Sequence, residues 1–200
     1  MAEAQTPQKP EGAEELERQG IQGIISALHT STNPEVRAYA AYLLGKGKNP
    51  VVIQPLIMAL ADNNKSVREQ AMLALVELGR SAVEPLAATM KDEKWVTRYR
   101  AAEALGKIAD EKAVQPLVQG LKDNRDHVRY MAAKGLQVLG DSEALVPMII
   151  LLNDQNRFVR LMAVRALSAI GGKSAHEALA HALEIETDAQ VREAITEAIK

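Results

Sequence analysis

Six arginines recur along the chain at an almost constant spacing, and they are the most regular residues that could carry chemistry. Neighbours are 30 to 32 residues apart, at Arg37, Arg68, Arg98, Arg129, Arg160 and Arg192. A guanidinium group can bind a carboxylate or a phosphate through two parallel hydrogen bonds, so an anion-binding ladder is one interpretation. Five of the six also have an acid six residues upstream, at Asp62, Asp92, Asp123, Asp154 and Glu186. This second pattern favours internal pairs of arginine and acid across the turns, and hence a structural ladder.

A short segment near residue 180 comes closest to a metal site. His176 and Glu177 are adjacent, and His181 follows them. One such pair is too small a ligand set for a metal that needs three or four protein ligands. We therefore predict no metal and no cofactor, and we expect His176 to be a partly buried residue of a helix face. The same column holds apolar residues in other repeats, at Val83, Val114 and Leu145.

Other catalytic signatures are missing from the sequence. The chain has no cysteine, so thiolate metal sites and cysteine nucleophiles are excluded. Gly171 and Gly172 have no nucleotide-binding pattern around them, and we find no nucleophilic triad or pair of catalytic carboxylates. We predict that the protein has no catalytic residues and is not an enzyme.

The composition narrows the function classes further. The 200 residues carry 24 basic and 26 acidic side chains, a balance that disfavours a generic polyanion binder. The hydrophobic fraction of 47% is sufficient for a sizeable core, and it comes mostly from aliphatic residues because only one Trp, four Tyr and one Phe are present. Residues 1–12 lack the apolar stretch of a signal peptide, and no apolar segment reaches the ~20 residues of a membrane-spanning helix. We expect a cytoplasmic protein that does not enter a membrane.

The arginines stand in repeated units that each contain two helical patterns. In the first pattern an apolar residue follows the arginine by seven positions, at Leu44, Leu75, Leu105, Leu136, Leu167 and Ile199. The second pattern carries a proline that belongs in the first turn of a helix, at Pro55, Pro85, Pro116 and Pro147. Gly79, Gly140 and Gly171 are expected to end first helices. No strand pattern of period two is present.

A single helix pair cannot bury its apolar stripe, so the units are expected to stack on one another. The predicted fold is all-α, a right-handed α-solenoid. We predict a flexible tail over residues 1–12 and one solenoid over residues 13–200. The predicted units span residues 13–30, 31–61, 62–91, 92–122, 123–153 and 154–184, followed by a capping helix at 188–200.

Three segments give the chain a resemblance to a known family. They are residues 33–37 (Asn-Pro-Glu-Val-Arg), residues 100–106 (Arg-Ala-Ala-Glu-Ala-Leu-Gly) and residues 113–117 (Ala-Val-Gln-Pro-Leu). These segments resemble the short HEAT repeats of the phycobilisome-lyase type, over roughly residues 14–200. The resembling motifs hold repeats together, so the resemblance implies a fold and leaves the function open.

The resemblance also implies alternatives to a binding protein. HEAT-type proteins include subunits of bilin lyases, and the deoxyhypusine hydroxylases are iron enzymes that use several His-Glu pairs spread over their repeats. This chain has one such pair, so a subunit of a HEAT-type lyase or hydroxylase complex is kept as an alternative function. A nucleic-acid-binding solenoid is the second alternative.

The resemblance implies that the second helices line a concave surface. The exposed stripe expected there holds two lysines against three glutamates, and this balance disfavours nucleic acid. The fourth proline-containing helix differs from the others because apolar residues, Val146 and Ile150, replace polar or small ones. We predict a protein-binding scaffold whose site is centred on this pair. The surrounding site residues are Gln115, Gln119, Met58 and His181. Self-association, or cover by the N-terminal tail, is the alternative use of this patch.

The aromatic residues leave one question open. Trp95 stands at a helix start where other repeats have polar residues or proline, and it is expected to fold back over the adjacent turn. Tyr99 and Tyr130 share one column of the first helices. The sequence is compatible with an exposed stripe or with a packing surface at these tyrosines.

Overall fold

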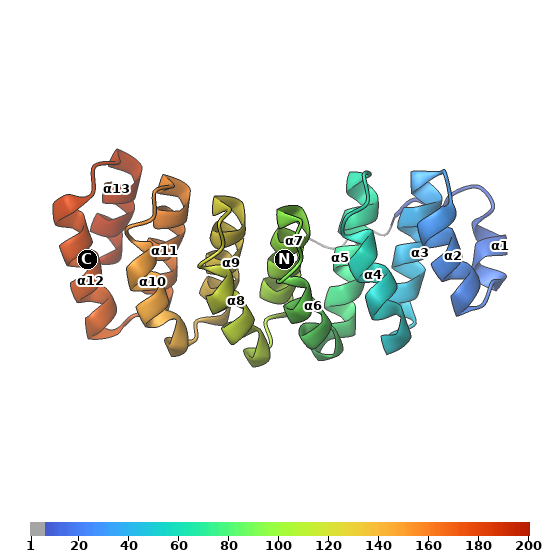
Figure 1. Ribbon diagram of the computed structural model, residues 1–200, viewed down its shortest axis with the longest axis horizontal. Coiled ribbons are helices and arrows are strands. Elements are labelled where there is room, and N and C mark those ends of the chain that lie inside the picture. The colour runs from blue at the N-terminus through green and yellow to red at the C-terminus, as the bar shows by residue number, and fades with distance from the viewer. Residues whose placement is uncertain (1–6) are drawn as a thin grey trace. The chain divides into compact units, whose positions relative to one another are not determined.

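The computed structural model describes residues 7–200, and every regular element within that range is a helix (Figure 1). The chain divides into two compact units, the first ending at Asp92 and the second beginning at Glu93, and each unit is described by itself. Of the tail predicted at residues 1–12, residues 1–6 lie outside the described part. In the remainder, Pro10 is buried and the Lys9 ammonium lies 3.3 Å from the Glu17 carboxylate.

In the first unit, first helices pack on first helices, and second helices pack on second helices. Its helices are α1 (Ala13–Arg18), α2 (Ile21–Thr30), α3 (Pro34–Lys46), α4 (Ile53–Ala59), α5 (Lys65–Leu78) and α6 (Val83–Thr89). The first helices of two repeats, α3 and α5, contact each other, and so do the second helices α4 and α6. The unit is therefore a stack of helix pairs, as the repeats predict.

The second unit has the same construction. Its helices are α7 (Trp95–Ile108), α8 (Val114–Gly120), α9 (Asp126–Leu139), α10 (Leu145–Leu151), α11 (Arg157–Ile170), α12 (Gly172–Ile185) and α13 (Ala189–Ala198). The first helices α7, α9, α11 and α13 form one layer in which each contacts the next. The second helices α8, α10 and α12 lie on the other side of this layer (Figure 1). The predicted all-α solenoid is confirmed.

Polar caps and glycines set the limits of the first helices. The Asn64 carboxamide oxygen accepts the backbone N–H of Ser66 at 2.8 Å, and Asn156 caps α11 in the same way through Phe158. Such caps satisfy N–H groups that lack a partner in the first helical turn. The glycines predicted to end first helices do so with positive φ, of 56° at Gly79, 61° at Gly140 and 69° at Gly171.

The prolines define the second helices, as predicted. Each lies in the first turn of α4, α6, α8 or α10, and a short 3-10 turn precedes each of these helices. Helix α12 has Ala178 instead and runs continuously from Gly172. This difference corrects the expectation for His176, which is exposed. Without the preceding 3-10 turn, only Ala175 of the pair Ala175 and His176 faces the core, whereas Ala113 and Val114 are both buried.

The core of each unit consists of the repeated leucine columns. Leu105, Leu136 and Leu167 of the first helices are fully buried, as is Leu117 of α8. Helices α7 and α9 approach closely at two glycines, because a Cβ added to Gly106 would lie 2.7 Å from the Gly135 Cα atom. The core residues thus determine how neighbouring helices align with one another, and the other residues of each helix form its exposed surface.

Candidate functional site

The exposed pair predicted on α10 is a consequence of the helix register. Met148 and Leu151 point into the core, so Val146 and Ile150, which are one turn apart, share the opposite face. Val146 is 64% exposed and Ile150 is 68% exposed. These two aliphatic side chains lie outside the core, and with Ile185 of α12 they are the large hydrophobic side chains that the second helices of this unit expose.

Polar residues of the neighbouring second helices complete this surface. Gln115 and Gln119 are exposed on α8, and the Gln115 amide donates to the Glu143 carboxylate at 2.7 Å, in the turn that leads into α10. His181 is exposed on α12, with its Nδ1 atom 3.5 Å from the Glu184 carboxylate. We define the second-helix surface by five residues of the second unit: Val146, Ile150, Gln115, Gln119 and His181.

Met58, the sixth predicted site residue, belongs to the first unit. It is 60% exposed on α4, where Leu56 and Ile57 are buried. Its exposure agrees with the expected helix face. The second-helix surface is nevertheless defined without it, because its other members all lie in the second unit.

The arginine ladder exists, and its acidic partners differ from the predicted ones. Arg129 donates from Nε and Nη2 to the two carboxylate oxygens of Asp154, at 2.6 and 2.9 Å, and from Nη1 to the backbone carbonyl of Asp123 at 2.9 Å. The acid six residues upstream therefore contributes only its carbonyl, and the carboxylate comes from the following repeat. The same arrangement joins Arg37 to Asp62, Arg98 to Asp123 and Arg160 to Glu186.

In two of the ladder pairs, hydrogen bonding shifts the pKa values in the direction that favours the charged forms. The hydrogen bonds to Asp62 raise the pKa of Arg37, and those from Arg37 lower the pKa of Asp62. The pKa of Glu186 is lowered in the same way by Arg160. The side chains of the four pairs are 6 to 17% exposed. These guanidinium groups are occupied internally, which supports the structural ladder over an anion-binding site.

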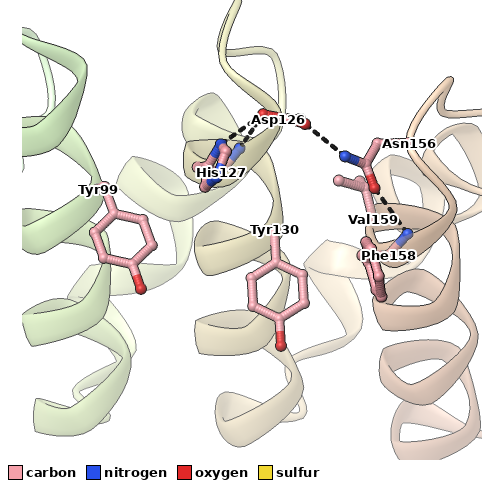
Figure 2. A pocket seen from close by; sticks show the side chains of 7 residues that line it. All are labelled: Tyr99, Asp126, His127, Tyr130, Asn156, Phe158 and Val159. Atoms are coloured by element: carbon pink, nitrogen blue, oxygen red, sulfur yellow. Dashed lines mark hydrogen bonds and ion pairs between the residues drawn. The ribbon is translucent and has the colours of Figure 1, made fainter.

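A pocket on the first helices of the second unit was missed in the sequence. It has a volume of about 270 Å³ and is lined by Tyr99 of α7, by Asp126, His127 and Tyr130 of α9, and by Asn156, Phe158 and Val159 at the start of α11 (Figure 2). We call it the aromatic pocket. In the sequence, the pocket is indicated only by aromatic residues at equivalent repeat positions: Tyr99 and Tyr130 share one position, and His127 and Phe158 share another. The contributions of Phe158 and Asp126 were not predicted.

Trp95 flanks the aromatic pocket. Its ring packs against the ring of His127, with centroids 5.2 Å apart. It therefore contacts the next first helix, α9, and does not follow the expectation that it covers the adjacent turn. Tyr99 and Tyr130 are both half-buried.

Within residues 7–200, no three side chains of His, Cys, Asp or Glu converge in a way that would hold a metal ion. Over the same residues, no helix combines the length and the hydrophobicity needed to cross a membrane.

Solved structures with this architecture include enzymes and designed proteins. The complex of CpcE and CpcF of phycocyanin lyase from Nostoc sp. PCC7120 is 26% identical, with a TM-score of 0.69 over 76% of this chain and 100% of that chain. Human deoxyhypusine hydroxylase in complex with glycerol is 25% identical, with a TM-score of 0.52 over 90% of this chain and 72% of that chain. A designed armadillo repeat protein in complex with the peptide (KR)4 is 21% identical, with a TM-score of 0.57 and coverages of 91% and 100%; this likeness shows the fold alone.

The sequence itself identifies the family. No curated protein matches the chain. The family model for HEAT repeats matches at three overlapping positions, residues 21–83, 77–133 and 114–200. These matches extend over nearly all of the helical part described above, and the protein therefore belongs to the HEAT-repeat family.

Proposed function

We propose that the protein is a non-catalytic scaffold that binds a partner protein along the second-helix surface. The observation that carries the proposal is the exposure of Val146 and Ile150 on the same face of α10. Two adjacent branched aliphatic side chains, placed beside the amides of Gln115 and Gln119, form an apolar anchor with a polar rim. Binding energy at protein interfaces is concentrated in a few central residues that become buried on binding.

Two further observations support a protein as the partner. The phycocyanin lyase neighbour is a complex of two chains, CpcE and CpcF, so a related solenoid is found in a protein assembly. The second helices of the second unit carry one exposed lysine, Lys173, and two exposed glutamates, Glu177 and Glu184, and this balance disfavours nucleic acid. A cytoplasmic location remains part of the proposal.

A double variant, Val146→Glu with Ile150→Glu, tests the proposed surface. The control is Val138→Glu, which introduces one glutamate at a valine that is 62% exposed on first helix α9, away from the proposed surface. Each form is used as bait in an extract of the cells that make the protein, with quantitative mass spectrometry, and its mass in solution is measured by light scattering. The proposal expects a partner captured by the parent and by the control and lost by the double variant.

Two other outcomes would argue against a partner protein at this surface. If the double variant is folded and monomeric like the parent and still captures the partner, the second-helix surface is not the site. If the parent is a dimer and only the double variant is a monomer, the patch binds a second copy of the chain.

The second candidate function is a subunit of a HEAT-type lyase or hydroxylase complex, and it is favoured by the 26% identity to the lyase complex. Elemental analysis of the purified protein separates a metal-dependent form of it from the scaffold. The scaffold proposal expects no stoichiometric iron or zinc. Stoichiometric metal that is lost on His176→Ala would favour the enzyme.

A further inference from the structure

The aromatic pocket is formed by three successive first helices, and its chemistry differs from that of the second-helix surface. Figure 2 shows Tyr99 and Tyr130 side by side on α7 and α9, with Asp126 at one end and Phe158 on the next helix. Its volume of about 270 Å³ is just below the range of ~300 to 1,000 Å³ typical of sites for drug-sized ligands. The space therefore suits one side chain of a partner better than a large cofactor.

Asp126 gives this pocket its charge. Its Oδ1 atom accepts hydrogen bonds from the backbone N–H of His127 at 2.8 Å and from the His127 ring at 2.7 Å, and its Oδ2 atom accepts from the Asn156 amide. The hydrogen bond from Asn156 is the main cause that lowers the pKa of Asp126, so the carboxylate is ionised at neutral pH. A carboxylate offers about four acceptor positions, and three are used here, so one remains for a ligand.

The rings in this region already attract guanidinium groups of the chain itself. The Arg157 Cζ atom lies 4.7 Å from the Phe158 ring centroid, and the Arg100 Cζ atom lies 5.1 Å from that of Tyr99. Both arginines are paired with acids, Arg157 with Asp188 at 3.3 Å and Arg100 with Glu103 at 2.8 Å. Their charges are thereby compensated within the chain, whereas Asp126 is the one formally charged side chain among the seven that line the pocket.

We propose that the aromatic pocket binds the side chain of a lysine or arginine presented by a peptide segment of a partner. The ammonium or guanidinium group would meet the Asp126 carboxylate and the faces of the tyrosine rings, which attract cations. The aliphatic stem of the same side chain would lie on Phe158, which is 52% exposed. An uncharged apolar occupant fits less well, because it would remove water from the Asp126 carboxylate without replacing its hydrogen bonds.

The single tryptophan provides a specific readout, since Trp95 packs on His127, a residue of the pocket wall. A capped alanine peptide with one central lysine, and its arginine counterpart, are titrated while Trp95 fluorescence is followed. The matched probe is the same peptide with norleucine, which keeps the stem and removes the charge. We expect saturable binding of the lysine and arginine peptides, and binding at least about tenfold weaker for the norleucine peptide.

Variants assign the binding to the pocket. Asp126→Asn keeps the shape and removes the charge, and it should weaken binding of the lysine peptide about tenfold. Tyr130→Leu should weaken it as well, while Tyr130→Phe should retain it because the ring is kept. Glu197→Gln, the same change of carboxylate to amide at an exposed residue of α13, should have no effect. Circular dichroism and thermal melts establish that each variant is folded.

Three results would overturn the proposal: no saturable change with either charged peptide, equal affinity for the norleucine peptide, or unchanged affinity in folded Asp126→Asn. The double variant at Val146 and Ile150 separates this site from the proposed function. It should bind the lysine peptide like the parent, so failure at one surface leaves the test of the other intact.

Discussion

The two faces of the second unit are made by the same repeats and offer different chemistry. On the second helices, Val146 and Ile150 form an exposed aliphatic pair without a formal charge beside it on α10. On the first helices, Tyr99, Tyr130 and Phe158 surround a pocket that contains a carboxylate. The recurring leucines occupy the core, and residues that differ between repeats, such as Val146 and Phe158, lie on the surface. Function is therefore to be sought where one repeat departs from its siblings.

The largest effect is expected from a substitution in the core that both faces share. Leu117 is fully buried, and its Leu117→Ala substitution should lower the free energy of unfolding by about 2 to 5 kcal/mol because it leaves a cavity. Lys122→Ala, an exposed change two residues beyond α8, should stay within about 0.5 kcal/mol. Urea melts measure both, and equal losses would contradict the assignment of faces.

The next effect concerns the ladder that joins the repeats. Arg160→Met leaves Glu186 without its charged partner and should cost about 1 to 3 kcal/mol at pH 7. The folded-state pKa of Glu186 is lowered, so its contribution is complete above the ordinary value of 4.5 and is lost as the pH falls through the folded-state pKa. The difference between variant and parent should therefore shrink as the pH falls from 5 to about 3.

Arg165→Met provides the control for this pH series, because Arg165 is exposed on the same helix. It should change stability little, and by the same amount at each pH. If Arg160→Met shows a difference that does not depend on pH, the ladder pair does not account for its stability.

A smaller loss of stability is expected for a substitution between two first helices, and this change should disturb the first-helix face without disturbing the second-helix face. In Gly106→Ala, the new Cβ would lie 2.7 Å from the Gly135 Cα atom, so α7 and α9 must move apart, at a cost of about 1 to 2 kcal/mol. Because Tyr99 and Tyr130 stand on these two helices, Trp95 fluorescence should change while partner capture through Val146 and Ile150 persists. Loss of both functions in the folded variant would show that the two faces are not independent.

The smallest effect on stability is expected for the double variant Val146→Glu and Ile150→Glu. Both side chains are exposed and lie outside the core, so each change should stay within about 0.5 kcal/mol in urea melts. A much larger loss would mean that the aliphatic pair is packed in the folded protein, and it would remove this surface from the comparison.

The repeat pattern predicted the buried leucines and the prolines of the second helices, because period and side-chain type determine which face of a helix is buried. It did not identify the ladder partners. Asp123 precedes Arg129 by six residues, and Asp154 stands at the equivalent position of the next repeat. Only the stacking of repeats shows which carboxylate reaches the guanidinium group.

Two other features depended on three-dimensional detail. The aromatic pocket depends on the lateral distance between first helices, so the contributions of Asp126 and Phe158 could not be derived from column positions. The exposure of His176 depends on a 3-10 turn that is missing before α12, and a column alignment assumes that this turn is present in every repeat. The binding roles assigned to Val146, Ile150 and their neighbours remain predictions.

The ladder also bears on how such a chain can lengthen. Each joined repeat presents an acid to the arginine before it and an arginine to the acid after it, as Asp123 and Arg129 do for Arg98 and Asp154. The two sides of a repeat are therefore complementary, and a second copy of residues 123–153 inserted after Asn153 would find a partner at both junctions. Duplication within the gene would add a complete, correctly registered unit, together with new surface positions on which selection can act.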